Sequence, residues 1–112
     1  MERIRCRAGS STFWVTWDGQ LRPCGMMTAP TEDLGTQSFR GAWANIRAAR
    51  ERIMVPPACS GCPVRSACDQ CSAICQAETG AFTGVPEYMC QRTRAHLELG
   101  RKWLEEQGAP EA

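Results

Sequence analysis

The sequence of 112 residues has no run of about 18 apolar residues, which excludes a membrane-spanning helix. Its first residues carry three arginines and no apolar stretch, so a secretory signal peptide is not recognisable. Charge of one sign is not in excess either, because 13 Lys and Arg against 12 Asp and Glu leave a formal net charge of +1. This balance excludes a strongly basic nucleic-acid-binding arm. We therefore expect a cytoplasmic protein that binds neither nucleic acid nor membranes.

Cysteine, in contrast, is abundant, with 8 residues in this short chain. In the reducing cytosol, clustered cysteines more often bind metal than form disulfides. The length favours a single domain over residues 1–112 and is too short for a large barrel enzyme, which needs roughly 200 residues. No nucleophile or acid–base pair is recognisable, so we predict no catalytic residue.

A small α+β fold is predicted. Aromatic and β-branched residues around Asp18 and Gly19 indicate an N-terminal β-hairpin over about residues 12–23, with a two-residue turn. We expect Trp14 and Trp17 to pack in its core. Residues 25–37, rich in Gly, Thr and Pro, are predicted to form a loop.

Two helices follow from the pattern of the remaining sequence. Apolar residues at helical spacing predict a middle helix from its N-cap, Ser38, to about Ile53. A C-terminal helix is predicted from Pro86 to about Gln107. Between them, residues 59–75 show little periodicity and are predicted to form cysteine-rich loops. With metal in place of a large hydrophobic core, the metal-free chain is expected to fold poorly.

The spacing of the cysteines carries the functional information. Five of them follow the pattern Cys-x2-Cys-x5-Cys-x2-Cys-x3-Cys, and they are Cys59, Cys62, Cys68, Cys71 and Cys75. Three more lie outside this stretch: Cys6, Cys24 and Cys90. Eight thiolates supply two four-ligand sites, which fits two iron–sulfur clusters or two zinc ions, and a disulfide scaffold is the third interpretation. Iron–sulfur is favoured, because zinc ribbons separate their cysteine pairs by about 15 to 20 residues.

The order Cys6-x12-Gly19-x4-Cys24, followed by Cys59-x2-Cys62-x5-Cys68, a further cysteine and Cys90, resembles the SPASM domain. This domain is the auxiliary-cluster module of radical S-adenosylmethionine enzymes, many of which modify peptides and proteins. The resemblance covers about residues 6–95. The segments Phe13-Trp14-Val15-Thr16-Trp17-Asp18-Gly19 and Pro86-Glu87-Tyr88-Met89-Cys90 are also similar to the peptide-maturase branch of the family.

The resemblance implies two auxiliary [4Fe–4S] clusters and assigns their ligands. One cluster would be held by Cys59, Cys62, Cys68 and Cys90, and the other by Cys6, Cys24 and a cysteine of the 71–75 region. The family's usual ligand position is Ser72 here. Cys71 is the preferred third ligand because its spacing departs least from the pattern, and Cys75 is then a fourth ligand or a free thiol.

The run Cys-x3-Cys-x2-Cys that a radical S-adenosylmethionine core requires is absent. By itself the chain is therefore not expected to be an enzyme. The resemblance implies that S-adenosylmethionine binds only on a separate catalytic domain, in cis or in trans, and that a peptide or protein is the substrate. Since Cys6 lies so near the first residue, we expect a fragment of a longer enzyme. The predicted function is electron relay or substrate positioning by two clusters, and the alternative is a structural zinc module that mediates protein contacts.

Overall fold

A three-stranded antiparallel sheet lies near the start of the chain, in a computed structural model that describes residues 2–108. Its strands follow the order β1-β2-β3 and are β1 (Trp14–Val15), β2 (Gln20–Arg22) and β3 (Glu32–Asp33). The predicted hairpin is confirmed as β1 and β2. The prediction of a loop over residues 25–37 is wrong at β3, which pairs with β2 over two positions. Two acidic residues carry no strand pattern of their own, so this pairing depends on β2.

The turn between β1 and β2 differs from the predicted one. It has four residues, 16–19, and is closed by Thr16, whose backbone N–H donates to the Gln20 carbonyl at 2.9 Å. The Thr16 hydroxyl also accepts a hydrogen bond from the Gln20 backbone N–H at 2.9 Å. A type I′ turn needs positive φ at both central residues, whereas of Asp18 and Gly19 only Gly19 has positive φ, at +84°. The two-residue turn was therefore a wrong prediction.

The middle helix, α1 (Phe39–Arg50), begins as predicted. Ser38 is its N-cap, and the Ser38 hydroxyl accepts a hydrogen bond from the Gly41 backbone N–H at 3.1 Å. The helix ends at Arg50, three residues before the predicted Ile53. The Arg50 guanidinium there donates to the carbonyls of Cys6 at 2.8 Å and Ala8 at 2.9 Å. Arg50 thus fastens the N-terminal segment to the end of α1.

Two small apolar clusters form the core. One lies between α1 and the sheet and contains Leu21, Ala42 and Ile46, all fully buried. The other, which we call the central cluster, joins distant segments and contains Ile4, Ala8, Met27, Ile53 and Ala73. The rings of Phe13, Phe39 and Trp43 pack on one another at the edge of the first cluster, with the Phe13 and Phe39 centroids 5.1 Å apart.

The cysteine-rich stretch contains more regular structure than predicted. It includes α2 (Pro57–Ser60), the 3₁₀ helix η1 (Arg65–Ala67) and α3 (Ser72–Thr79). The prediction of loops is wrong at α3, an eight-residue helix that ends at Gly80, with φ +84°. Burial of Ala73 against distant segments stabilises α3, in which Cys75 is also buried, and no side chain caps the start of the helix.

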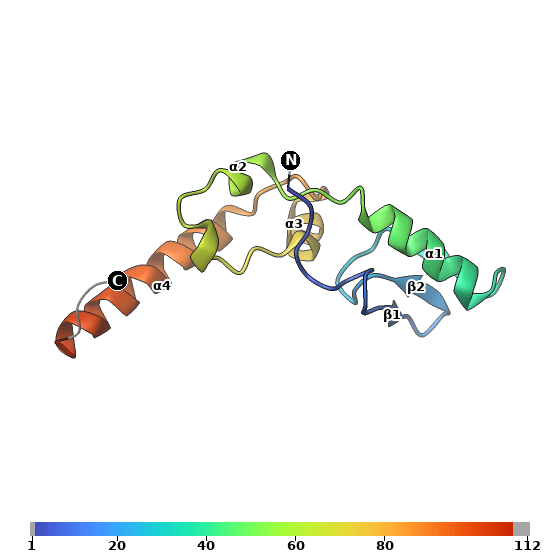
Figure 1. Cartoon of the computed structure of the whole chain (residues 1–112), viewed down its shortest axis with the longest axis horizontal. Coiled ribbons are helices and arrows are strands. Elements are labelled where there is room, and N and C mark those ends of the chain that lie inside the picture. Colours follow the sequence, from blue (N-terminus) through green and yellow to red (C-terminus); the bar gives the residue numbers. More distant parts are fainter. Residues whose placement is uncertain (1, 109–112) are drawn as a thin grey trace.

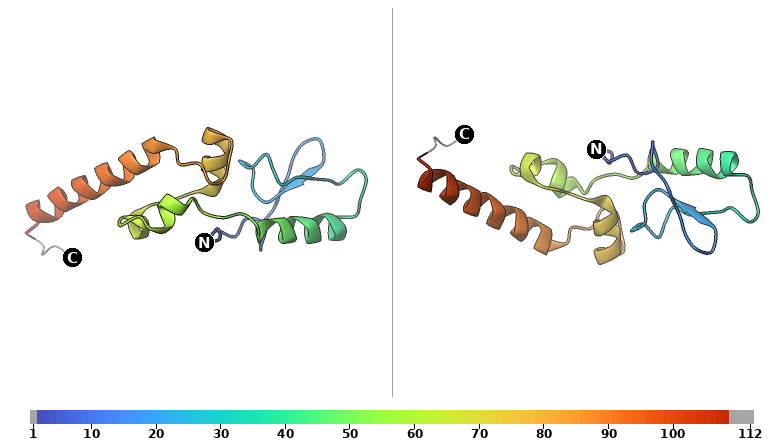
Figure 2. Two further views of the ribbon diagram at one scale, coloured as in Figure 1. Left: turned by 90° about the horizontal axis from the view of Figure 1, so that it is seen from above. Right: turned by 90° about the horizontal axis from the view of Figure 1, so that it is seen from below.

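The C-terminal helix, α4 (Glu87–Glu106), confirms the prediction within one residue at each end. Figure 1 shows an elongated chain, 60 Å by 25 Å by 20 Å, with the sheet and α1 at one end and α4 at the other. The cysteine-rich segments α2 and α3 lie between these ends, as both views of Figure 2 also show. Within the described residues, no helix is long and apolar enough to cross a membrane.

Candidate metal centre

Successive backbone turns connect the first cysteines of the cysteine-rich stretch. The N–H of Cys59 donates to the carbonyl of Pro56, and the N–H of Cys62 donates to that of Cys59, at 2.9 and 3.2 Å. The same three-residue step continues from Cys62 to Arg65 at 3.1 Å and from Arg65 to Cys68 at 3.3 Å. Arg65 is thus the step between Cys62 and Cys68 in this series, in the middle of the five residues that separate them.

The thiol of Cys59 lies in a neighbourhood of other cysteines. Burial raises the pKa of Cys59, and negative charge on Cys75, Cys90 and Cys68 raises it further. The positive charge of Arg65 acts in the opposite direction. Two of the other three cysteines predicted for that site, Cys68 and Cys90, therefore act on Cys59, as does Cys75, which lies outside the predicted ligand set of that site. Cys62 is joined to Cys59 through the backbone turn.

A second neighbourhood lies at the N-terminal segment and the start of α3. Cys6 and Cys71 line one cavity of about 110 Å³. Cys24 and Cys71 both pack against the central cluster, and two members of that cluster, Ile4 and Ala8, flank Cys6 in the chain. The sulfur of Cys24 accepts a hydrogen bond from the backbone N–H of Met26 at 3.3 Å. Cys6, Cys24 and Cys71 thus lie around the same part of the core.

Cys75 lies between these neighbourhoods and is the most buried of the cysteines, with 1% of its surface exposed. Burial raises its pKa, and charge on Cys71 and Cys68 adds to the effect, while a hydrogen bond from Gln70 opposes it. The Gln70 amide donates to the Cys75 sulfur at 3.6 Å. The backbone N–H of Cys75 also donates to the Cys71 carbonyl at 3.0 Å, one helical turn earlier. Cys71 and Cys75 therefore share one side of α3.

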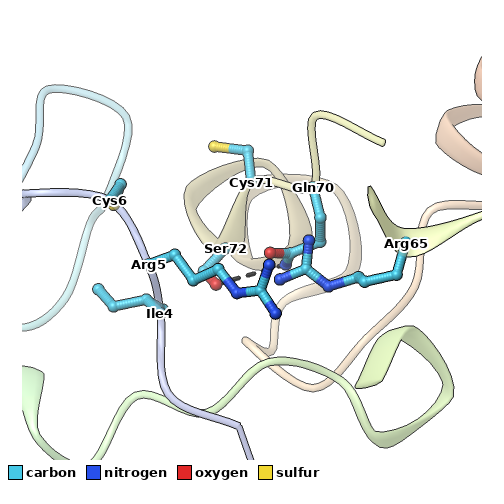
Figure 3. A pocket seen from close by; sticks show the side chains of 7 residues that line it. All are labelled: Ile4, Arg5, Cys6, Arg65, Gln70, Cys71 and Ser72. Atoms are coloured by element: carbon cyan, nitrogen blue, oxygen red, sulfur yellow. Dashed lines mark hydrogen bonds between the residues drawn. The ribbon is translucent and has the colours of Figure 1, made fainter. Parts of the chain in front are cut away.

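Charged groups surround the cavity beside Cys6 and Cys71. Figure 3 shows the side chains of Arg5 and Arg65 extending toward one another, with Gln70 beside them. Both arginines bind Glu2 of the N-terminal segment, Arg65 at 2.6 Å and Arg5 at 2.7 Å. Burial would raise the pKa of Glu2, but the hydrogen bond and charge of Arg65, with Arg5, outweigh it and lower that pKa.

One polar atom at this cavity has no partner. Among the described residues, the Nε atom of Arg65 is buried and makes no hydrogen bond to the protein. A buried donor without an acceptor is rare in proteins and costs free energy. The atom therefore indicates that the cavity accommodates a group with acceptor atoms.

The eight thiols are all free, which suits a metal centre and gives no support to a disulfide scaffold. In residues 2–108 no three Cys, His, Asp or Glu side chains converge closely enough to hold a metal ion. The chemistry of the donors nevertheless fits an iron–sulfur cluster, whose usual ligands are cysteine thiolates. The unpartnered Arg65 donor fits as well, because cluster sulfur accepts hydrogen bonds. Which cysteines hold which cluster stays a prediction.

The two tryptophans of the hairpin are the remaining candidates of the sequence. The prediction that Trp17 packs in the hairpin core is wrong, because its side chain is 98% exposed at the turn. The prediction is wrong for Trp14 as well, whose side chain is 54% exposed and whose ring covers the backbone of Gly25, next to Cys24. Sequence reasoning did not single out Arg65, Gln70 or Glu2, although the place of Arg65 midway between Cys62 and Cys68 was visible in the spacing.

Comparison with known protein families decides between the iron–sulfur, zinc and disulfide interpretations of the cysteine pattern. A model of the SPASM iron–sulfur cluster-binding domain matches residues 6–72, more than half of the chain. The chain belongs to the SPASM family. As a SPASM domain it binds iron–sulfur clusters, and the matched residues include six of its cysteines, while Cys75 and Cys90 lie beyond them. No curated protein and no solved structure matches the chain.

Proposed function

We propose that this SPASM chain, as a single domain, is the auxiliary-cluster module of a radical S-adenosylmethionine maturase and holds two [4Fe–4S] clusters. When bound, such clusters supply one-electron redox chemistry and, where an iron is open, a binding position for substrate. The active site would belong to a separate catalytic domain, in cis or in trans, that acts on a peptide or protein. We also propose a cytoplasmic location, where cysteines remain reduced.

The observation that carries the proposal is the division of the cysteines into two neighbourhoods. One contains Cys59, whose pKa is raised by charge on Cys90 and Cys68 as well as on Cys75, with Cys62 joined to Cys59 by a backbone turn. Four thiols in one neighbourhood match the ligand number of a [4Fe–4S] cluster. A single zinc ion or a single cluster would leave the second neighbourhood without a role.

The second neighbourhood supports a second cluster. Cys6 and Cys71 line one cavity, and Cys24 packs on the same apolar cluster as Cys71. Cys75 follows Cys71 by one helical turn, which makes it our proposed fourth ligand. The cavity is lined by Arg5, Arg65 and Gln70, whose N–H groups suit a negatively charged cluster.

Single cysteine variants test this division after anaerobic reconstitution with iron and sulfide. We expect Cys90→Ala and Cys71→Ala each to remove about half of the iron, because each breaks one four-thiolate site. The double variant should remove nearly all of it. If either single variant removed all of the iron, or if both left the content unchanged, the two-site assignment would be wrong.

The fourth ligand and the catalytic partner need separate tests. Cys75→Ala should lower the iron content as Cys71→Ala does, whereas unchanged iron and an unchanged spectrum would remove Cys75 from the ligand set. For the partner, the gene sequence upstream of Met1 should encode Cys-x3-Cys-x2-Cys, in frame or in an adjacent gene. Zinc bound in place of iron after anaerobic reconstitution would favour the structural zinc module.

A further inference from the structure

We propose that Arg65 tunes the reduction potentials of both clusters through its positive charge, and that Glu2 partly offsets this charge. The inference rests on the proposed two-cluster function and adds to it the residues that set the potential. It assigns to Arg65 a role through charge, with no bond to iron.

The backbone places Arg65 within the first group of cysteines. The three-residue turns that connect Cys59, Cys62 and Cys68 include Arg65 as one of their steps. Arg65 is thus close to the first group along the chain.

The side chain of Arg65 also reaches the second group. It lines the cavity shared with Cys6 and Cys71 (Figure 3), and only 14% of the side chain is exposed. Water and salt screen a charge in this position less than they screen a surface charge. Its Nε–H donor is buried and has no acceptor among the described residues, as expected if a bound group supplies that acceptor.

The charges around the cavity sum to a positive value. Arg65 and Arg5 carry two positive charges and share the single carboxylate of Glu2, which leaves a net +1. A [4Fe–4S] centre with four thiolates carries about −2 when its core is +2, and one more negative charge after reduction. A nearby positive charge stabilises the reduced form more than the oxidised form. Arg65 should therefore raise both potentials, and Glu2 should lower them.

Two variants separate this role from a structural one, because both break the same ion pair but change the charge in opposite directions. Arg65→Gln removes a positive charge, and Glu2→Gln removes a negative one. If the ion pair served only to hold the fold, both variants would shift the potentials in the same direction. Arg65→Lys keeps the charge, and Arg101→Gln removes a charge that pairs with Glu98 and Glu105 at the exposed surface of α4.

The test is a redox titration followed by electron paramagnetic resonance on the reconstituted full chain. We expect Arg65→Gln to lower both midpoint potentials by about 59 mV, a tenfold change in the ratio of oxidised to reduced cluster. Glu2→Gln should raise them, and Arg65→Lys and Arg101→Gln should leave them near the wild-type values. Shifts of one sign in Arg65→Gln and Glu2→Gln, or no shift in either, would overturn the inference.

Iron content is measured before any potential, which keeps the two proposals distinguishable. A wild-type chain without iron would refute the proposed function itself. If Arg65→Gln alone failed to retain iron, Glu2→Gln would decide: an upward shift supports the inference, and an unchanged or lowered potential refutes it.

Discussion

The guanidinium of Arg65 donates a 2.6 Å hydrogen bond to the carboxylate of Glu2, across 63 positions of the sequence. This ion pair joins the N-terminal segment, which carries Cys6, to the cysteine-rich stretch. Both side chains are mostly buried, with 14% and 20% of their surfaces exposed. The pair therefore joins the two chain segments that carry the two groups of cysteines, and it places charge between these groups.

The stability that this pair confers should depend on pH. Glu2, next to Arg65, Arg5 and Ser60, has a pKa below its usual value of 4.5. Its contribution is thus complete above pH 4.5 and is lost as the pH falls through the lowered pKa of the folded state. We expect Glu2→Gln to lower the melting temperature at pH 7 and 5.5, and the difference from wild type to shrink at pH 4. Anaerobic thermal unfolding followed by circular dichroism measures this.

Glu51→Gln is the matched control for this prediction. It breaks ion pairs with Arg3 and, at 3.7 Å, with Arg50, and because the Glu51 side chain itself is half exposed, its effect at any pH should be small. A difference between wild type and Glu2→Gln that grew as the pH fell would have the wrong sign for our interpretation.

The aromatic contacts between the hairpin and α1 should stabilise the N-terminal half. Phe13 packs edge-on against Phe39 and Trp43, with ring centroids 5.1 and 5.7 Å away. Phe13→Ala should therefore lower the free energy of unfolding by about 1 to 2 kcal/mol in denaturant titrations. Trp17→Ala, at a fully exposed position of the same hairpin, should change it by less than about 0.5 kcal/mol. Equal effects of the two variants would contradict this packing.

The loop after α3 should not tolerate a side chain at Gly84. A Cβ atom there would lie 1.9 Å from the hydroxyl oxygen of Thr79, which donates to the Cys75 carbonyl at 2.7 Å. We expect Gly84→Ala to destabilise the chain by about 1 to 3 kcal/mol in the same titrations. Thr79→Ala in the same chain removes the hydroxyl clash but keeps a Cβ atom 2.5 Å away, so it should restore only part of the loss.

Gly100→Ala provides the control, because a Cβ atom at this position of α4 would meet no atom within 4 Å outside its chain neighbours and the backbone of its own helix. Since alanine favours the helix, this variant should stabilise α4 by roughly 0.5 to 1 kcal/mol. If Gly84→Ala were as stable as wild type, the loop would pack differently from the described structure.

Local sequence patterns were enough to predict the elements that depend on nearby residues. Ser38 marks the start of α1 because its hydroxyl caps the helix three residues away. Pro86 likewise precedes α4. In contrast, β3 depends on pairing with β2, and α3 depends on burial of Ala73 against Ile53, Met27 and the N-terminal segment, all at least 20 positions away. Neither stabilising contact leaves a pattern in its own segment.

The same distinction holds for the candidate site. The cysteines were visible from their spacing, because ligands of one metal recur at short, fixed intervals. The contribution of Arg65 was not, because its environment combines a distant carboxylate, Glu2, with a cavity formed by Cys6 and Cys71. Only the folded chain brings these groups together.

The central claim, two [4Fe–4S] clusters in one SPASM chain, is tested most directly by counting iron and acid-labile sulfide after anaerobic reconstitution. Mössbauer spectroscopy on the same sample identifies the cluster type. We predict about eight iron and eight sulfide ions per chain, all in [4Fe–4S] clusters. About four of each, with no further uptake, would contradict the second cluster, and a colourless chain loaded with zinc would contradict the account as a whole.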